Sequence, residues 1–338
     1  MSQAREPLRD TLRRPLHTLR VSITDRCNFR CVYCMPKDVF GRDYPFLERK
    51  ELLTLEEIAR VAYVFAELGV RTVRITGGEP LVRRNVEHLV ELLAAIPGLE
   101  LALTTNGSLL TQKATPLARA GLDRVTVSLD SLDDATFRGL NGADFAVARV
   151  LEGIDAAAAA GLAVKVNAVV KRGANEDGVV PLAGHFRGSG HTLRFIEYMD
   201  VGSTNGWRLD DVVPAEEIVR RIHAVWPLEQ LPPNRGDETA LRFRYCDGAG
   251  EIGVIASVTQ PFCAGCSRAR LSADGRLFTC LFGVRGHDLR TSLRDGAADG
   301  QLADEIRRAW TGRADRYSEL RTGDTAALPK VEMSYIGG

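Results

Sequence analysis

The stretch from Leu19 to Cys34 reads LRVSITDRCNFRCVYC, and it decides how the rest of the chain is interpreted. Its first part, Leu19–Thr24, is apolar and rich in β-branched residues, which predicts a strand. Three cysteines follow, with three residues between the first two and two residues between the last two. Such a loop can hold three irons of a 4Fe-4S cluster and leave the fourth open for a substrate or cofactor. The sequence therefore predicts a cluster-binding loop at the exit of the first strand.

The other cysteines are concentrated near the opposite end of the chain. An odd count of seven in a chain this long argues against a disulfide framework. Structural zinc prefers four ligands, and the nearest histidines, His17 and His287, do not lie at zinc-finger spacings. We therefore expect two iron–sulfur sites, with zinc as the alternative, and a buried, inert thiol at the isolated Cys246. The predicted ligands are Cys27, Cys31 and Cys34 for the first cluster and Cys263, Cys266 and Cys280 for the second.

Apolar strands alternate with helical patterns over residues 19–200, which predicts an α/β fold with a parallel sheet and right-handed crossovers. Polar residues follow one strand after another, so a partial six-unit barrel with its chemistry at the strand exits is favoured over an open doubly wound sheet. The expected strands are Leu19–Thr24, Val70–Thr76, Leu99–Thr105, Arg124–Leu129, Ala163–Val170 and Thr192–Met199. The polar exits are Asp25–Cys27, Gly77–Glu79, Thr105–Asn106, Ser128–Asp130 and Glu197–Asp200.

Three regions are expected along the chain. Residues 1–15 are predicted to be a flexible N-terminal arm, residues 16–230 the partial barrel, and residues 231–338 a C-terminal extension with the second cysteine triplet. Helices are expected at Thr54–Leu68, Val86–Ile96, Ala146–Ala160 and Pro214–Trp226, and antiparallel strands at 241–245 and 252–258.

Composition excludes several classes of protein. The 338 residues include 44 Lys plus Arg and 44 Asp plus Glu, so the basic excess of a general nucleic-acid binder is missing. No apolar run approaches the roughly 18 residues of a membrane span, and the N-terminus lacks the apolar core of a signal peptide. We expect a cytoplasmic protein that binds neither nucleic acid nor membrane.

The cysteine loop, with the aromatic Tyr33 before its last cysteine, resembles the signature of the radical S-adenosylmethionine (SAM) superfamily. A second match is Thr76-Gly77-Gly78-Glu79-Pro80, where that superfamily has a glycine-rich turn beside the methionine part of SAM. The resemblance implies that the first triplet holds a 4Fe-4S cluster and that SAM binds to it. It also implies SAM contacts from Tyr33, Gly78, Ser128 and Met199.

The C-terminal region narrows the resemblance. Residues 262–271 read FCAGCSRARL, Cys280 follows, and the chain ends in Gly337-Gly338. This pattern is similar to the GTP 3′,8-cyclase family of molybdenum cofactor biosynthesis. The resemblance implies a second 4Fe-4S cluster that contacts guanine, and a glycine tail that reaches the active site at Gly337 and Gly338. It implies GTP contacts from Arg20, Arg74, Thr105, Lys165, Arg268 and Arg270.

Two positions depart from the family pattern. Thr72 stands where the family has lysine, which puts one phosphate or ribose contact in doubt, and Ser267 stands where asparagine is common.

The resemblance also implies a reaction. A 5′-deoxyadenosyl radical from SAM removes hydrogen from ribose carbon 3′ of GTP, and the carbon radical that results attacks guanine carbon 8. A further electron and proton then give (8S)-3′,8-cyclo-7,8-dihydroguanosine 5′-triphosphate. The implied partners are an electron donor such as flavodoxin or ferredoxin, and cyclic pyranopterin monophosphate synthase downstream, with the chain a monomer or homodimer. The rival interpretations are another two-cluster radical SAM enzyme acting on a peptide, and a non-catalytic zinc-binding scaffold.

Overall fold

A computed structural model describes residues 6–322 and 328–337, so Gly338 of the predicted tail lies outside the described residues. These residues form one twelve-stranded sheet, with the strand order β12-β11-β10-β1-β2-β3-β4-β5-β6-β9-β8-β7. The strands are β1 (Thr18–Ser22), β2 (Thr72–Thr76), β3 (Glu100–Thr105), β4 (Arg124–Ser128), β5 (Ala163–Val170), β6 (Thr192–Glu197), β7 (Leu228–Leu231), β8 (Leu241–Tyr245), β9 (Glu251–Ile255), β10 (Arg268–Leu271), β11 (Arg276–Phe278) and β12 (His287–Asp288).

The parallel sheet predicted from the sequence is confirmed. Strands β1 to β6 are neighbours in chain order and all pair in parallel. The C-terminal region extends this sheet at both edges, because β10 pairs in parallel with β1 and β9 pairs in parallel with β6. The sheet therefore curves as a partial barrel, and the antiparallel pair of β8 and β9 was also expected correctly.

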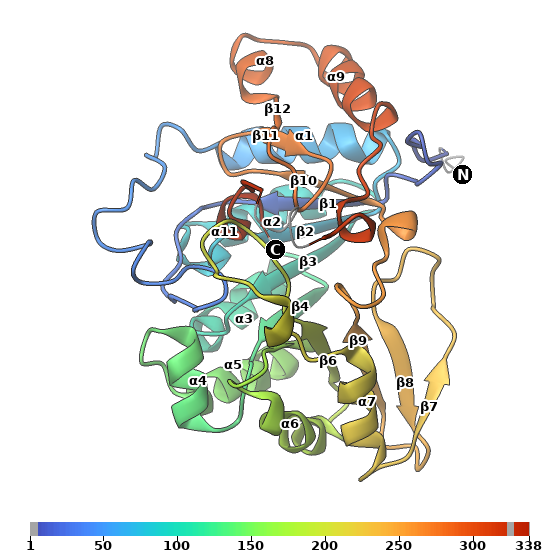
Figure 1. The fold of residues 1–338 in the computed structure, drawn as a ribbon. Coiled ribbons are helices and arrows are strands. Elements are labelled where there is room, and N and C mark those ends of the chain that lie inside the picture. The colour runs from blue at the N-terminus through green and yellow to red at the C-terminus, as the bar shows by residue number, and fades with distance from the viewer. Residues whose placement is uncertain (1–5, 323–327, 338) are drawn as a thin grey trace.

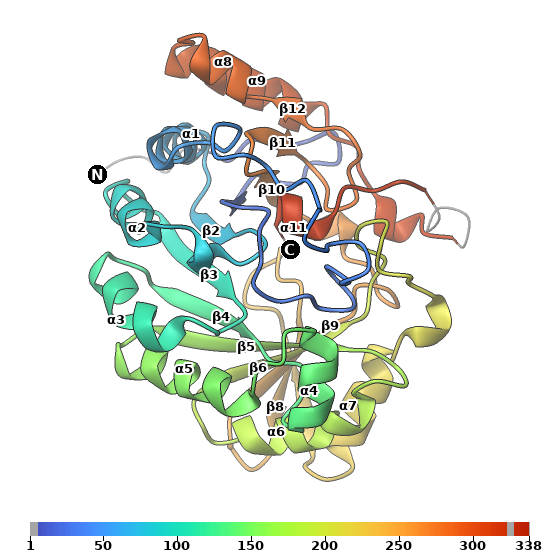
Figure 2. The same cartoon turned by 90° about the vertical axis from the view of Figure 1, so that its left-hand side faces the viewer.

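Helices cover the outer face of this sheet, and α9 packs beside α1 (Figures 1 and 2). The first of them shows how the sequence sets a boundary: Thr54 and Glu57 form a reciprocal capping box at the start of α1. The helices are α1 (Leu55–Glu67), α2 (Val86–Ala94), α3 (Leu110–Arg119), α4 (Asp134–Asn141), α5 (Val147–Ala159), α6 (Val179–Phe186), α7 (Ala215–His223), α8 (Arg290–Arg294), α9 (Asp299–Thr311) and α11 (Met333–Ile336).

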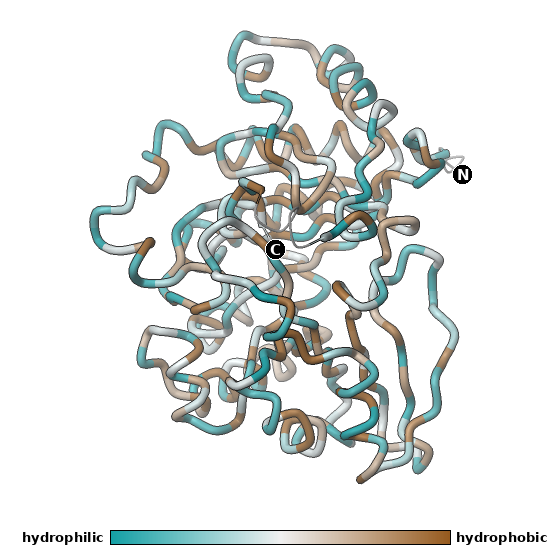
Figure 3. Tube along the Cα trace, in the orientation of Figure 1, coloured by the Kyte–Doolittle hydropathy of each residue, from teal (hydrophilic) through white to brown (hydrophobic). Residues whose placement is uncertain are grey.

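The strands separate an apolar face from a polar one. Along β5 the residues Val164, Val166, Ala168 and Val170 are buried, whereas the residues between them, Lys165 among them, are more exposed. Hydrophobic segments gather along the strands, and hydrophilic ones lie over the outer loops (Figure 3). Apolar side chains thus pack against the helices, and the alternate positions face the barrel interior. This second face supplies the site.

Two expectations fail. Cys246 was predicted to be buried but is exposed, because it follows β8 in the tight turn toward β9, where side chains project into water. The predicted flexible arm contains a packed segment, because Asp10 and Arg14 are buried with 6 and 2% exposure and bond to each other. In the described part of the chain, no helix has both the length and the apolar character needed to cross a membrane.

Candidate active site

A single cavity of about 300 Å³ brings the two cysteine triplets together. All six of these cysteines line it, although the triplets lie at opposite ends of the chain. The polar strand exits line it as well, through Gly77–Glu79 after β2, Thr105 and Asn106 at β3, and Ser128 and Asp130 at β4. The expectation that strand exits share one face of the barrel is therefore confirmed.

Arg30 links backbone carbonyl groups in and beside the first cysteine loop. Arg30 donates from Nη1 to the carbonyl oxygen of Cys27 at 2.7 Å and from Nε to that of Phe40 at 2.7 Å. The Cys27 thiol accepts from the backbone nitrogen of Phe29 at 3.3 Å, and burial raises its pKa to about 12. A thiol held in such surroundings becomes a thiolate only beside a strong positive charge, which a bound iron would supply. The loop therefore fits a cluster.

The second triplet has a different electrostatic setting. Burial acts to raise the pKa of Cys266, but the guanidinium groups of Arg268 and Arg313 outweigh it and lower that pKa to about 6. Around Cys280 burial outweighs the opposing effect of Arg270 and raises the pKa of the thiol to about 11. Three soft sulfur donors around one cavity wall fit an iron–sulfur cluster, and the arginines would stabilise their negative charge.

The glycine turn after β2 packs directly on the cysteine loop. A Cβ added at Gly78 would lie 2.3 Å from the carbonyl oxygen of Arg26, and one at Gly77 would lie 2.5 Å from that of Thr24. Glycine is therefore required here by the neighbouring backbone, whatever ligand the cavity holds. The other residues expected to contact SAM, Tyr33, Ser128 and Met199, also line the cavity.

Glu79 is a site residue to which the sequence interpretation gave no role. Its carboxylate accepts from the Thr105 hydroxyl at 2.8 Å and from the backbone nitrogens of Asn106 at 2.7 Å and Leu81 at 3.0 Å. Burial raises its pKa to about 7. A carboxylate placed directly after two glycines at a strand exit was the available signal. It ties the exits of β2 and β3 together at the cavity wall.

Asp130 was also missed as a site residue. It accepts from the Tyr33 hydroxyl at 2.7 Å and from the backbone nitrogen of Val169 at 2.9 Å. This contact joins the cysteine loop to the end of β4.

Cations crowd the deeper part of the cavity. Arg20, Arg74, Arg268 and Arg270 line it as expected, and so does Arg194 on β6, which sequence reasoning missed. Burial lowers the pKa of Arg20, and the neighbouring arginines Arg270, Arg74 and Arg268 lower it further. This mutual repulsion is relieved when an anion with several charges binds among them.

Lys165 lies beside this group on β5, although it is not part of the cavity wall. Burial and the neighbouring Arg194, Arg124 and Arg74 lower its pKa to about 8. The two departures from the family pattern have protein partners. Thr72 donates to Glu100 at 3.2 Å, and Ser267 donates to Asp237 at 2.6 Å.

The C-terminal segment reaches the middle of the molecule, where α11 lies in both perpendicular views (Figures 1 and 2). Gly337 follows this helix with a φ of +74°, and a Cβ there would lie 2.5 Å from Cγ2 of Thr76. Its carbonyl oxygen accepts a hydrogen bond from Nη1 of Arg270. The tail therefore contacts both β2 and one of the cavity arginines.

Comparisons with known proteins identify the family of the chain. The family model described as Radical SAM superfamily matches residues 21–184, and the one described as Molybdenum Cofactor Synthesis C matches residues 191–319. A protein of Acidothermus cellulolyticus named GTP 3′,8-cyclase is 55% identical over 360 residues, which cover 98% of this chain and 99% of the relative. The chain belongs to the GTP 3′,8-cyclase family.

Other members of the GTP 3′,8-cyclase family align over almost the same length. The relative from Xanthomonas axonopodis pv. citri is 50% identical over 334 residues, covering 98% of this chain and 99% of its own. The relative from Staphylococcus epidermidis is 44% identical, and the alignment covers 99% of this chain and 100% of the relative. Among solved structures, Streptococcus suis SuiB bound to S-adenosylmethionine has a TM-score of 0.61 at 16% identity, covering 94% of this chain and 72% of SuiB. The last likeness shows that this chain and SuiB share a fold.

Proposed function

We propose that this protein is a GTP 3′,8-cyclase that acts early in molybdenum cofactor biosynthesis. The observation that carries the proposal is the shared cavity, which is lined by both cysteine triplets and by four of the expected GTP-binding arginines. Relatives named GTP 3′,8-cyclase across nearly the whole chain support the same activity.

Each cysteine triplet would hold one 4Fe-4S cluster. Cys27, Cys31 and Cys34 would hold the cluster that binds SAM, and Cys263, Cys266 and Cys280 the cluster that faces guanine. When bound, the first cluster and SAM supply a 5′-deoxyadenosyl radical able to remove hydrogen from carbon 3′ of GTP, so that carbon 3′ can bond to guanine carbon 8. Tyr33, Gly78, Ser128 and Met199 would contact SAM.

The cationic part of the cavity would hold the triphosphate. Guanidinium forks match phosphate oxygens, and Arg20, Arg74, Arg268 and Arg270 present them from three neighbouring strands. Lys165 and Arg194 add charge from β5 and β6, and Thr105, whose hydroxyl donates to Glu79, also lines the cavity. Gly337 would close the cavity beside Arg270. This closure would orient the substrate and keep water from the reacting carbons.

The same proposal covers the partners. An electron donor such as flavodoxin or ferredoxin would supply the reducing electrons, and cyclic pyranopterin monophosphate synthase would take the product. We propose that the protein works as a monomer or homodimer in the cytoplasm, where thiols such as these remain reduced.

Anaerobic turnover tests the activity directly. Reconstituted protein is incubated with SAM, a strong reductant and GTP that carries a deuterium label on carbon 3′, and the products are identified by mass. Transfer of that label into 5′-deoxyadenosine, together with cyclised nucleotide, is the expected result. If 5′-deoxyadenosine forms only with a peptide substrate, the peptide-modifying alternative holds instead.

A further inference from the structure

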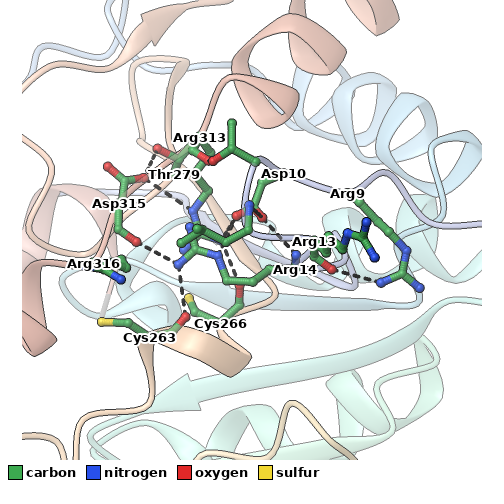
Figure 4. A network of polar contacts seen from close by, with 12 residues as sticks. Arg9, Asp10, Arg13, Arg14, Cys263, Cys266, Thr279, Arg313, Asp315 and Arg316 are labelled. Carbon is green, nitrogen blue, oxygen red and sulfur yellow. Dashed lines mark hydrogen bonds and ion pairs between the residues drawn. The ribbon is translucent and has the colours of Figure 1, made fainter.

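The N-terminal segment and the segment after α9 meet beside Cys263 and Cys266 of the second triplet (Figure 4). Asp10, Arg14 and Arg313 are buried there, with side-chain exposures of 0, 1 and 1%. The Asp10 carboxylate accepts from Nε of Arg14 at 2.5 Å and from Nη1 of Arg313 at 3.3 Å. Its other oxygen accepts from the backbone nitrogens of Leu12 at 2.9 Å and Arg14 at 2.8 Å. One carboxylate thus fixes two guanidinium groups.

The guanidinium groups of these two arginines also donate hydrogen bonds to backbone carbonyl groups of the cysteines. Arg14 donates from Nη1 to the carbonyl oxygen of Cys263 at 3.0 Å, and Arg313 donates from Nη1 to that of Cys266 at 2.7 Å. Both contacts are drawn in Figure 4. Two of the three cysteines are therefore held by side chains that come from outside their own loop.

The third cysteine is reached through its neighbour. Thr279, directly before Cys280, donates from its hydroxyl to the Asp315 carboxylate at 2.6 Å, and Arg313 donates to the same oxygen from Nε at 3.3 Å. Arg14 donates to the Asp315 carbonyl oxygen at 2.7 Å. The two stretches that carry the triplet are thus joined through one network, in which Arg14 and Arg313 are buried and Asp315 is partly exposed.

Burying this network is costly, because each ion loses its hydration. Nη2 of Arg14 is buried and, within the described residues, has no hydrogen-bond partner. If the network served only to anchor the N-terminal segment, well-packed apolar side chains would stabilise that contact equally well, without two buried arginines. Three thiolates around a cluster carry net negative charge, which offsets the cost of keeping two cations beside them.

We propose that Asp10, Arg14 and Arg313 form a brace that positions the second cysteine triplet and its cluster. The inference rests on the proposed function, since it requires a cluster at that triplet. Its members are positioning residues, because they act through the ligands. Their charge also stabilises the reduced, more negative form of the cluster, so the brace raises its reduction potential.

The test uses full-length protein that lacks the first cluster, with Cys27, Cys31 and Cys34 all changed to Ala. In this background Arg14→Gln and Arg313→Gln are reconstituted, and iron per chain, the EPR spectrum and the midpoint potential are measured. We expect about tenfold weaker cluster retention and a lower potential in the protein that retains it. Arg313→Lys keeps the charge without the fork, so it should bind less iron at a nearly unchanged potential. Arg9→Gln, an exposed arginine on the same turn, should match the background.

The reverse background separates the brace from a general effect on folding. With Cys263, Cys266 and Cys280 changed to Ala, the brace variants should leave the iron content and spectrum of the first cluster unchanged. Equal losses in both backgrounds would mean that the network only stabilises the fold, and the brace would be rejected. Unchanged iron and potential at the second cluster would reject it too. A background without any second-cluster iron would instead refute the second cluster of the proposed function.

Discussion

The two cysteine triplets reach the same cavity by different routes. The first lies within eight residues, and Arg30, from inside the loop, folds it through the carbonyl oxygens of Cys27 and Phe40. The second is divided between 263–266 and 280, and Arg14 and Arg313 join its parts from far along the chain. The ligands of the first site are therefore close together in the sequence and those of the second are not, although Tyr33 of the first loop also binds the distant Asp130. The first site should tolerate changes at Arg14 and Arg313 that the second does not.

Loss of a first-triplet ligand should have the largest effect. Cys27→Ala removes one thiolate from the cluster that would bind SAM, so 5′-deoxyadenosine and cyclised nucleotide should both disappear. Anaerobic assays with chromatography of both products measure this. SAM cleavage at the wild-type rate in this variant would show that the first triplet does not hold the SAM cluster.

Loss of a second-triplet ligand should prevent cyclisation but not all SAM cleavage. Cys263→Ala should abolish cyclisation but leave some uncoupled SAM cleavage, because the three cysteines that would hold the SAM cluster are unchanged. Iron analysis accompanies the assay. The same iron content in the Cys263/Cys266/Cys280→Ala variant as in the wild type would exclude a second cluster.

The tail tests whether the cavity must be closed beside the second triplet. Deleting Gly337 and Gly338 removes the carbonyl group that binds Arg270, and the product should fall severely while both clusters and some SAM cleavage remain. A bulky extension beyond Gly338 should do similar harm. Wild-type yield from the truncated protein, at saturating GTP and SAM, would remove the tail from the mechanism.

The cavity arginines should contribute to GTP affinity through hydrogen bonds to the phosphates. Arg268→Ala should weaken GTP binding by about 1.5–3 kcal/mol, which is roughly tenfold or more. Calorimetry with GTP and with guanosine checks the cause. Guanosine lacks phosphates and should bind wild type and variant equally poorly, so an equal loss for both ligands would indicate a folding defect.

Local patterns in the sequence were enough to predict the parallel sheet, the first cluster loop and the polar strand exits. The capping box of Thr54 and Glu57, for example, fixes the start of α1 within one residue of the prediction. Contacts between distant segments were not predictable in this way. Asp10 and Arg14 have the composition of a surface arm, and only their pairing with Arg313 buries them. Arg194 was missed because a single charged residue on a strand does not indicate a binding site until the fold places other charges beside it.

The smallest expected effect concerns Lys165, whose charge depends on pH. Burial and the surrounding arginines lower its pKa to about 8, so the side chain is charged below that pH and loses its proton above it. Because the charged form attracts phosphate, GTP affinity should fall by at most about twofold between pH 7 and pH 8, and further at higher pH. Lys165→Arg is the matched control, since a guanidinium group stays charged over this range and should flatten the profile. The affinities are measured by calorimetry, and the same slope in wild type and in Lys165→Arg would assign the pH dependence to another group.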